Sequence, residues 1–192
     1  MRRKPGSKLP ARQNGATLVI ALLVLVLIMM IGITAVSISN TQYKLAGNLQ
    51  FEDAAMNNAE TAIAAGEAWF NADPNNYKSG GFATYASGST PYLYPIGSSA
   101  AIISNPLTAV WSNSNSICVG SSDIACTGGK PEQRYVIQML SANNSLMGSS
   151  QAVGGRISAA CNRVNTYQII GRGISARGAS KTVVSYYSAP SC

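Results

Sequence analysis

The sequence predicts an α+β protein in which one long N-terminal helix packs on a C-terminal antiparallel β-sheet. Three observations support this prediction. A run without any charged residue extends from Ala16 to Ile38. Apolar side chains then recur at helical spacing as far as Phe70, and segments rich in β-forming residues lie between Arg134 and Tyr187. The first observation bears on the compartment and the other two bear on the architecture.

The uncharged run 16–38 is long enough to cross a membrane as a helix, which takes about 20 apolar residues. In the stretch of about 20 residues after it, the only basic residue is Lys44. Five basic residues precede it, namely Arg2, Arg3, Lys4, Lys8 and Arg12. Because an excess of Lys and Arg marks the cytoplasmic side, we expect the N-terminus inside and residues 39–192 outside.

The junction before the run allows three interpretations. A cleaved secretory signal has an apolar region of about 7–15 residues and a small-residue cleavage site, which this longer run fits poorly. In the second interpretation the run is a signal anchor that is never cleaved and holds the chain at the membrane. The third interpretation is a leader cut after a glycine, because Gly15 separates the basic residues from the apolar run in the sequence Arg12-Gln-Asn-Gly-Ala-Thr-Leu-Val-Ile20.

Residues 39–72 are expected to continue the same helix as an amphipathic half. The density of alanines favours helix, and the apolar residues follow spacings of threes and fours that place them on one helical face. Trp69 and Phe70 at its end are expected to pack against the outer domain. The predicted stripe consists of Leu45, Leu49, Met56, Ala59, Ile63 and Phe70.

The helix is expected to end at Asp73-Pro74, because proline lacks an amide donor and disfavours helix in the residue before it. Upstream of this stop, the interpretation is that polar residues lie on the exposed helix surface, namely Asn57, Asn58 and Glu60.

Residues 73–192 are expected to form one β-rich domain with an antiparallel sheet of about four strands. One face of the sheet would pack on the outer half of the helix. The turn 176–180 would join the last two strands into a hairpin, and 101–103 would add a short strand or helix. The clearest strand segments are 134–140, 166–170 and 182–187.

Four cysteines lie on the side expected to be outside, where disulfides persist. Four cysteines allow three pairings. We expect Cys118–Cys126, which closes a tight loop, and Cys161–Cys192, which ties down the C-terminus. No metal site is expected, because the chain has no histidine and no C-x-x-C pair.

The junction at Gly15 and Ala16 resembles the prepilin cleavage site of type IV pilins and type II secretion pseudopilins. By this resemblance residues 1–15 are a leader, and a prepilin peptidase cuts after Gly15 and methylates the new N-terminus at Ala16. The resemblance implies a type IV pilin-like fold, and the expected Cys161–Cys192 bridge matches the C-terminal disulfide loop typical of pilins.

The N-terminal region resembles that of PilX-type minor pilins in three short segments that occur in the same order. They are Gly-Ala-Thr-Leu-Val-Ile-Ala-Leu-Leu from Gly15, Lys44-Leu-Ala-Gly-Asn48 and Ala59-Glu-Thr-Ala62. The stretches 167–178 and 181–184 resemble the final hairpin of that group. One departure is Ile20 at the mature fifth position, where most major pilins have a glutamate thought to meet the amine of a neighbouring subunit. A subunit without that carboxylate fits best at a filament end, although insertion along the shaft stays open.

Removal of the leader changes how the charge is interpreted. The chain has 14 Lys/Arg and seven Asp/Glu, and five basic residues leave with the leader, so direct nucleic-acid binding is not expected. Without histidine an imidazole base is excluded, and residues 75–192 have only Asp123 and Glu132 as carboxylate side chains. The segment Gly171-Arg-Gly173-Ile-Ser-Ala lacks the context of a dinucleotide fingerprint, and its glycines are expected to serve a bulge or bend. No enzymatic activity and no cofactor are expected.

The main functional hypothesis is a minor pilin that waits in the inner membrane with its C-terminal domain periplasmic. It then joins other minor pilins and the major pilin to prime a filament, at or near the tip, supporting piliation, twitching motility and adhesion. A type II secretion pseudopilin would have the same chemistry in a different machine. A third hypothesis is a signal-anchored adhesin, with loops in 75–133 as the binding module and contact residues Tyr77, Tyr85, Tyr92, Tyr94 and Trp111.

Overall fold

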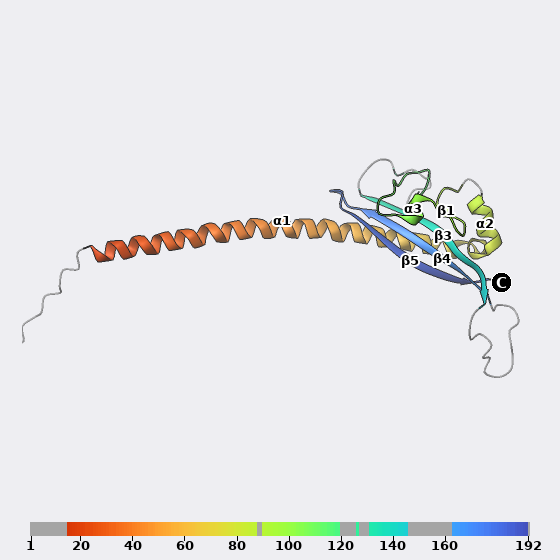
Figure 1. Cartoon of the computed structure of the whole chain (residues 1–192), viewed down its shortest axis with the longest axis horizontal. Coiled ribbons are helices and arrows are strands. Elements are labelled where there is room, and N and C mark those ends of the chain that lie inside the picture. The colour runs from red at the N-terminus through yellow and green to blue at the C-terminus, as the bar shows by residue number, and fades with distance from the viewer. Residues whose placement is uncertain (1–14, 88–89, 120–125, 127–130, 146–162, 192) are drawn as a thin grey trace, which may run out of the picture. The chain divides into compact units, whose positions relative to one another are not determined.

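The computed structural model describes residues 15–87, 90–119, 126, 131–145 and 163–191. The chain divides into two compact units, Met1–Gly47 and Asn48–Cys192. Helix α1 (Ala16–Ala72) contributes residues to both units. The long apolar helix followed by a sheet makes the chain an α+β protein, as predicted (Figure 1).

Among its described residues, the second unit contains the end of α1, three shorter helices and five strands. The helices are η1 (Pro74–Tyr77), α2 (Ser79–Ser87) and α3 (Ala101–Ser104). The strands are β1 (Leu93–Tyr94), β2 (Ile117–Cys118), β3 (Glu132–Ser145), β4 (Arg163–Ile174) and β5 (Ser180–Pro190). The sheet order is β1-β3-β4-β5, and β2 pairs with β3 beside β1.

The prediction of a purely antiparallel sheet was wrong, because the sheet is mixed. The pairs β3–β4, β4–β5 and β2–β3 are antiparallel, but β1 runs parallel to β3, with Leu93 opposite Ile137. Parallel strands need a crossover of a dozen or more residues. The long connection between Tyr94 and Glu132 meets this requirement, and it also contains α3 and β2.

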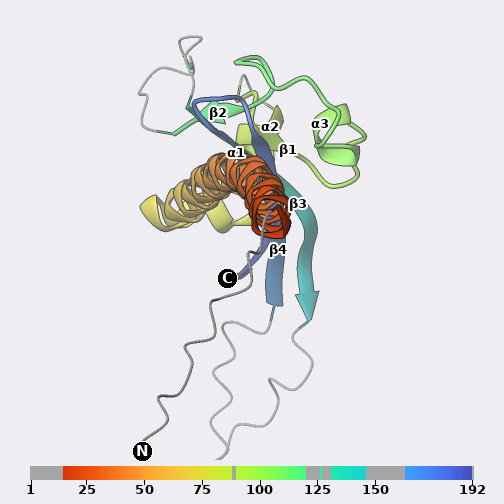
Figure 2. The ribbon, with the colours of Figure 1, turned by 90° about the vertical axis from the view of Figure 1, so that its left-hand side faces the viewer.

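The two faces of the sheet are covered by different parts of the second unit. Tyr135, Ile137 and Ile169 lie in one buried cluster with Ile63 and Phe70 of α1. On the opposite face, a second cluster joins Val136 and Ile170 of the sheet to Ile102 of α3 and to Trp111. Successive strand residues point to opposite faces, so α1 covers one face of the sheet and the 100–111 segment covers the other (Figure 2).

Glycines let α1 approach the sheet closely. A Cβ at Gly173 would lie 2.2 Å from the carbonyl oxygen of Ala55, and one at Gly171 would lie 2.7 Å from that of Ala59. On the helix, a Cβ at Gly66 would lie 2.7 Å from Ile169 Cγ2. The expectation of a bulge or bend at Gly171 and Gly173 was therefore wrong, since both keep regular pairing on either side and are needed for close packing.

The predicted apolar stripe of α1 is correct only in its second half. Ala59, Ile63 and Phe70 are buried, whereas Leu45, Leu49 and Met56 are exposed. The buried face instead consists of Ala55, Ala59, Ala62, Ile63, Gly66 and Phe70. It is made mostly of small residues, because the backbone of β4 comes too close for larger side chains along much of it.

Polar side chains fasten α1 and the following η1 to the sheet. Asn58 was expected on the exposed surface, but its Nδ2 donates to the carbonyl of Ile174 at 2.9 Å and its Oδ1 accepts from Gln133 at 2.9 Å. Beyond the end of the helix, the carbonyl of Tyr77 accepts hydrogen bonds from Asn165 Nδ2 at 2.8 Å and from the Tyr167 hydroxyl at 2.6 Å. Burial raises the pKa of Tyr167 to about 12, so this hydroxyl stays a donor at neutral pH.

The helix ends where the sequence predicted. Asp73 lies just after Ala72, and its carboxylate accepts a hydrogen bond from the backbone amide of Asn75 at 2.8 Å. Pro74 begins η1, a position where a missing amide donor costs nothing. Asn76 then turns back and donates to the carbonyl of Trp69 at 2.6 Å, which satisfies one of the last acceptors of α1.

Candidate functional site

The candidate processing junction coincides with the start of α1. Gly15 has φ +100°, in the left-handed region that favours glycine, and Ala16 is the first helical residue. The Gly15 carbonyl accepts a hydrogen bond from the amide of Val19 at 3.4 Å. No described atom lies within 4 Å of a Cβ built at Gly15, so glycine is favoured here by backbone conformation rather than by packing. The bond expected to be cut therefore joins a left-handed glycine to a helix terminus.

Apolar side chains surround α1 on all sides after this junction. Leu18, Leu25 and Ile33 are 70%, 62% and 67% exposed, and none of the residues 16–36 is buried. Among the described residues, α1 is the one helix long and apolar enough to cross a membrane. In water, so large a contiguous apolar surface is unfavourable, so lipid or other apolar helices are its natural surroundings.

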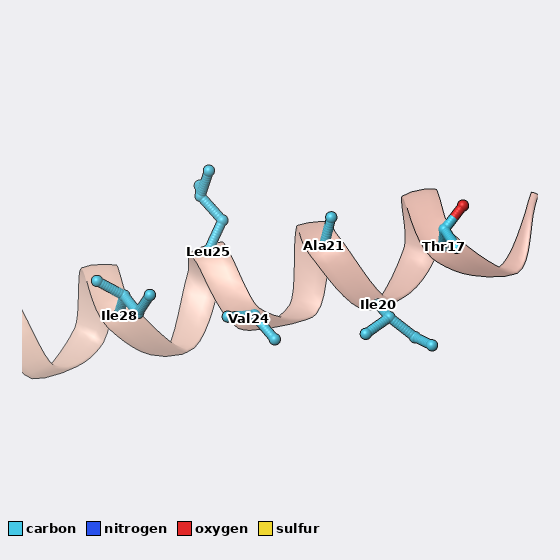
Figure 3. Close-up of a pocket in the computed structure, with 6 residues that line it drawn as sticks. All are labelled: Thr17, Ile20, Ala21, Val24, Leu25 and Ile28. Carbon is cyan, nitrogen blue, oxygen red and sulfur yellow. The ribbon is translucent and has the colours of Figure 1, made fainter.

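One groove on this surface contains the residue at the expected mature fifth position. Figure 3 shows Thr17, Ala21 and Leu25 along one line of the helix, and Ile20, Val24 and Ile28 along another. Residues four apart share a helix face, so each line presents a row of side chains. Thr17 is the one polar side chain in the lining, and Ile20 is 61% exposed. This groove can therefore accept an apolar helix but offers no carboxylate to an ammonium group.

The described cysteines form a disulfide rather than a thiolate site. Cys118 at the end of β2 is bonded to Cys126, with a Cα–Cα distance of 5.6 Å, which is the pairing expected for the tight loop. The carboxylate of Glu132 lies within 4.8 Å of both sulfurs. A metal would need the thiolates, which the disulfide removes, and Glu132 already accepts a hydrogen bond from Arg134. The expected Cys161–Cys192 pair and Asp123 lie outside the described residues.

The aromatic residues suggested as adhesive contacts are used mainly for packing. Trp111 is 9% exposed, and its indole nitrogen donates to the carbonyl of Pro106 at 2.9 Å. The Tyr94 hydroxyl donates to the carbonyl of Asn115 at 2.9 Å, and Tyr85 and Tyr92 stand edge-on to Trp69. Tyr85 keeps 38% of its surface exposed, and the more exposed large side chains of this region are aliphatic, namely Ile96, Leu107 and Val110.

Two arginines on the sheet face away from α1 were not anticipated from the sequence. Arg134 and Arg172 are opposite each other on β3 and β4. Arg134 is buried and bound to Glu132, to Ser116 at 3.3 Å and to Asn113 at 2.7 Å. Burial, with Arg134 close by, lowers the pKa of Arg172.

Arg172 also lies over the ring of Trp111, with Cζ 5.8 Å from the ring centre. This contact holds the segment between α3 and β2 against the sheet.

Comparisons with known proteins add no relatives: no family model, no curated protein and no solved structure matches this chain.

Proposed function

We propose that this chain is a minor pilin of the PilX type. Its role is structural: it helps to prime a type IV pilus and stays at or near the tip, supporting piliation, twitching motility and adhesion. Before assembly it lies in the inner membrane with a cytoplasmic N-terminus and a periplasmic C-terminal domain. Its partners are the prepilin peptidase, other minor pilins and the major pilin.

The observation that carries this proposal is the combination at the start of α1. A basic leader, a left-handed Gly15 and an all-round apolar helix beginning at Ala16 follow one another without a gap. After cleavage the apolar helix would begin at its own N-terminus, free of the leader charges that hold it at the cytoplasmic surface. Such a helix can exchange lipid for other apolar helices, which is the step a filament requires.

The second unit supports the same proposal, because it supplies its own core. Its hydrophobic clusters contain residues from Ala62 onward and none from the first unit. The apolar part of α1 is therefore available for lipid or for other subunits without loss of that core. The tip position is supported by Ile20, since a subunit without a carboxylate there would leave a neighbouring amine unpaired inside a shaft.

Mass spectrometry of the protein from membranes tests the proposal. We expect the mature chain to begin with N-methylated Ala16, and we expect the uncut chain to accumulate in cells with an inactive prepilin peptidase. A Gly15→Val variant should also stay uncut, whereas Asn14→Gln serves as a control one residue away. A chain that starts at Met1 in cells with active peptidase, or a cut elsewhere, would remove the pilin interpretation.

A deletion strain scored for filaments, twitching and protein secretion together then separates the machines. Loss of filaments and twitching with normal secretion fits a minor pilin. Loss of secretion alone would assign the chain to a type II secretion system, and normal filaments with lost adherence would favour an adhesin.

A further inference from the structure

Strand β5 presents an open edge at the end of the sheet. It is the last strand in the order β1-β3-β4-β5, and Figure 1 shows no strand beyond it. Among the described residues, no backbone hydrogen bond reaches the side of β5 that faces away from β4. Lys181 and Pro190 stand near its two ends, but the residues between them are uncharged. A long uncharged edge of this kind can pair with another strand.

The face of β5 away from α1 adds exposed apolar surface to this edge. Val184 is 41% exposed and Tyr186 is 67% exposed. Their neighbours on β4 are Ile170, which is buried, and Gln168. A further strand beside β5 would bring its own side chains against Val184 and Tyr186, where β-branched or aromatic residues form favourable cross-strand pairs.

The other face of the same edge is flanked by carboxylates of α1. Glu52 binds Lys181 at 2.9 Å, and Glu67 accepts a hydrogen bond from Ser185 at 3.1 Å, so these two acids lie beside β5. Between Asn48 and Ala72 the helix carries two further acids, Asp53 and Glu60, both exposed and without an ion pair in the described residues. At 3.6 residues per turn, all four acids fall within an arc of about 100°.

We propose that the β5 edge binds an extended segment of a partner protein in which basic and apolar residues alternate. The segment would add to the sheet as a further strand, with main-chain hydrogen bonds along residues 182–189. Its apolar side chains would cover Val184 and Tyr186, and its Lys or Arg side chains would face Glu60 and Glu67 on the side of α1. Charge selects this occupant, because three of the four acids have no basic partner among the described residues.

The test uses the full chain in detergent micelles and a synthetic peptide of alternating valine and lysine. Hydrogen exchange should slow at the outward amides of residues 182–189, by about tenfold at a peptide concentration ten times Kd. Replacing lysine by glutamate in the peptide should abolish this protection. Glu60→Gln should weaken binding by about two- to fivefold, because it removes one exposed charge pair.

Thr61→Lys is the matched control, because it changes the helix charge by the same amount. Thr61 lies about 100° further around the helix than Glu60, away from β5, so peptide affinity should not change. Equal binding of the glutamate peptide would overturn the proposal. So would outward β5 amides that are already protected in the dilute chain, or protection that rises with protein concentration without peptide, which would assign the edge to a second copy. All the residues whose exchange or substitution is measured belong to the second unit, so the outcome is independent of the pilin assignment.

Discussion

The two parts of helix α1 differ in whether their apolar side chains are covered. In the first unit, leucines and isoleucines are exposed, as Leu25 is at 62%. In the second unit, alanines and a glycine are buried, and Ala55, Ala59 and Ala62 have no exposed surface. Apolar character alone therefore does not decide which helix residues are covered in this protein. Most of the covered residues are small, because a sheet strand that contributes glycines comes close to this part of the helix.

The difference also separates two kinds of interaction. The second part of α1 is held by specific contacts to one sheet, including the Asn58 amide between Ile174 and Gln133. The first part offers only a uniform apolar surface with the groove around Ile20 and Val24. Lipid chains or other apolar helices can cover such a surface, because dispersion and hydrophobic contacts require no directional partner.

The largest expected effect is in the second unit, at Phe70. Its ring lies 4.6 Å from the ring centres of both Tyr167 and Tyr187 and has no exposed surface. Phe70→Ala should lower the free energy of unfolding by about 3–5 kcal/mol, measured by chemical denaturation of the full chain in detergent. Leu25→Ala removes a similarly apolar side chain from the first unit and should leave that unfolding unchanged. Equal losses would contradict the contrast between the two parts.

A charge in the first part should instead affect the membrane and not the fold. Val24→Asp should disfavour insertion by about 3 kcal/mol, which is roughly a hundredfold in the equilibrium. The fraction of chain that resists alkaline extraction from membranes measures this change. Thr61→Asp, on the exposed face of the second part, should leave extraction unaltered. If Val24→Asp inserts as well as the unchanged chain, the apolar run does not cross the membrane.

The smallest effect of the three is expected from a single methyl group at the helix–sheet contact. Gly173→Ala places a Cβ against the backbone of Ala55 and Ala59 and should cost about 1–3 kcal/mol of unfolding free energy. Gly80→Ala in α2 meets no described atom within 4 Å and should be neutral or stabilising by up to about 1 kcal/mol. Thermal unfolding of both variants gives the comparison, and the same sign for both would argue against close packing at Gly173.

Local patterns predicted several features of the candidate site correctly. The helix begins at Ala16 and ends before Asp73, where the uncharged run and the Asp73-Pro74 pair indicated. Cys118 and Cys126 are also bonded, as their short separation suggested. The buried face of α1 was predicted less well, because periodicity finds an apolar stripe but does not say where along the helix a sheet begins to cover it.

The sequence by itself determined the long helix, its stop and the strand-forming segments, because each depends on residues within a few turns of one another. Only the tertiary structure decided that Gly66, Gly171 and Gly173 serve one close contact, that β1 pairs in parallel with β3, and that β5 is the last strand in the sheet order of the described residues. These features join segments far apart in the chain, and the steric space between two backbones cannot be inferred from either segment alone.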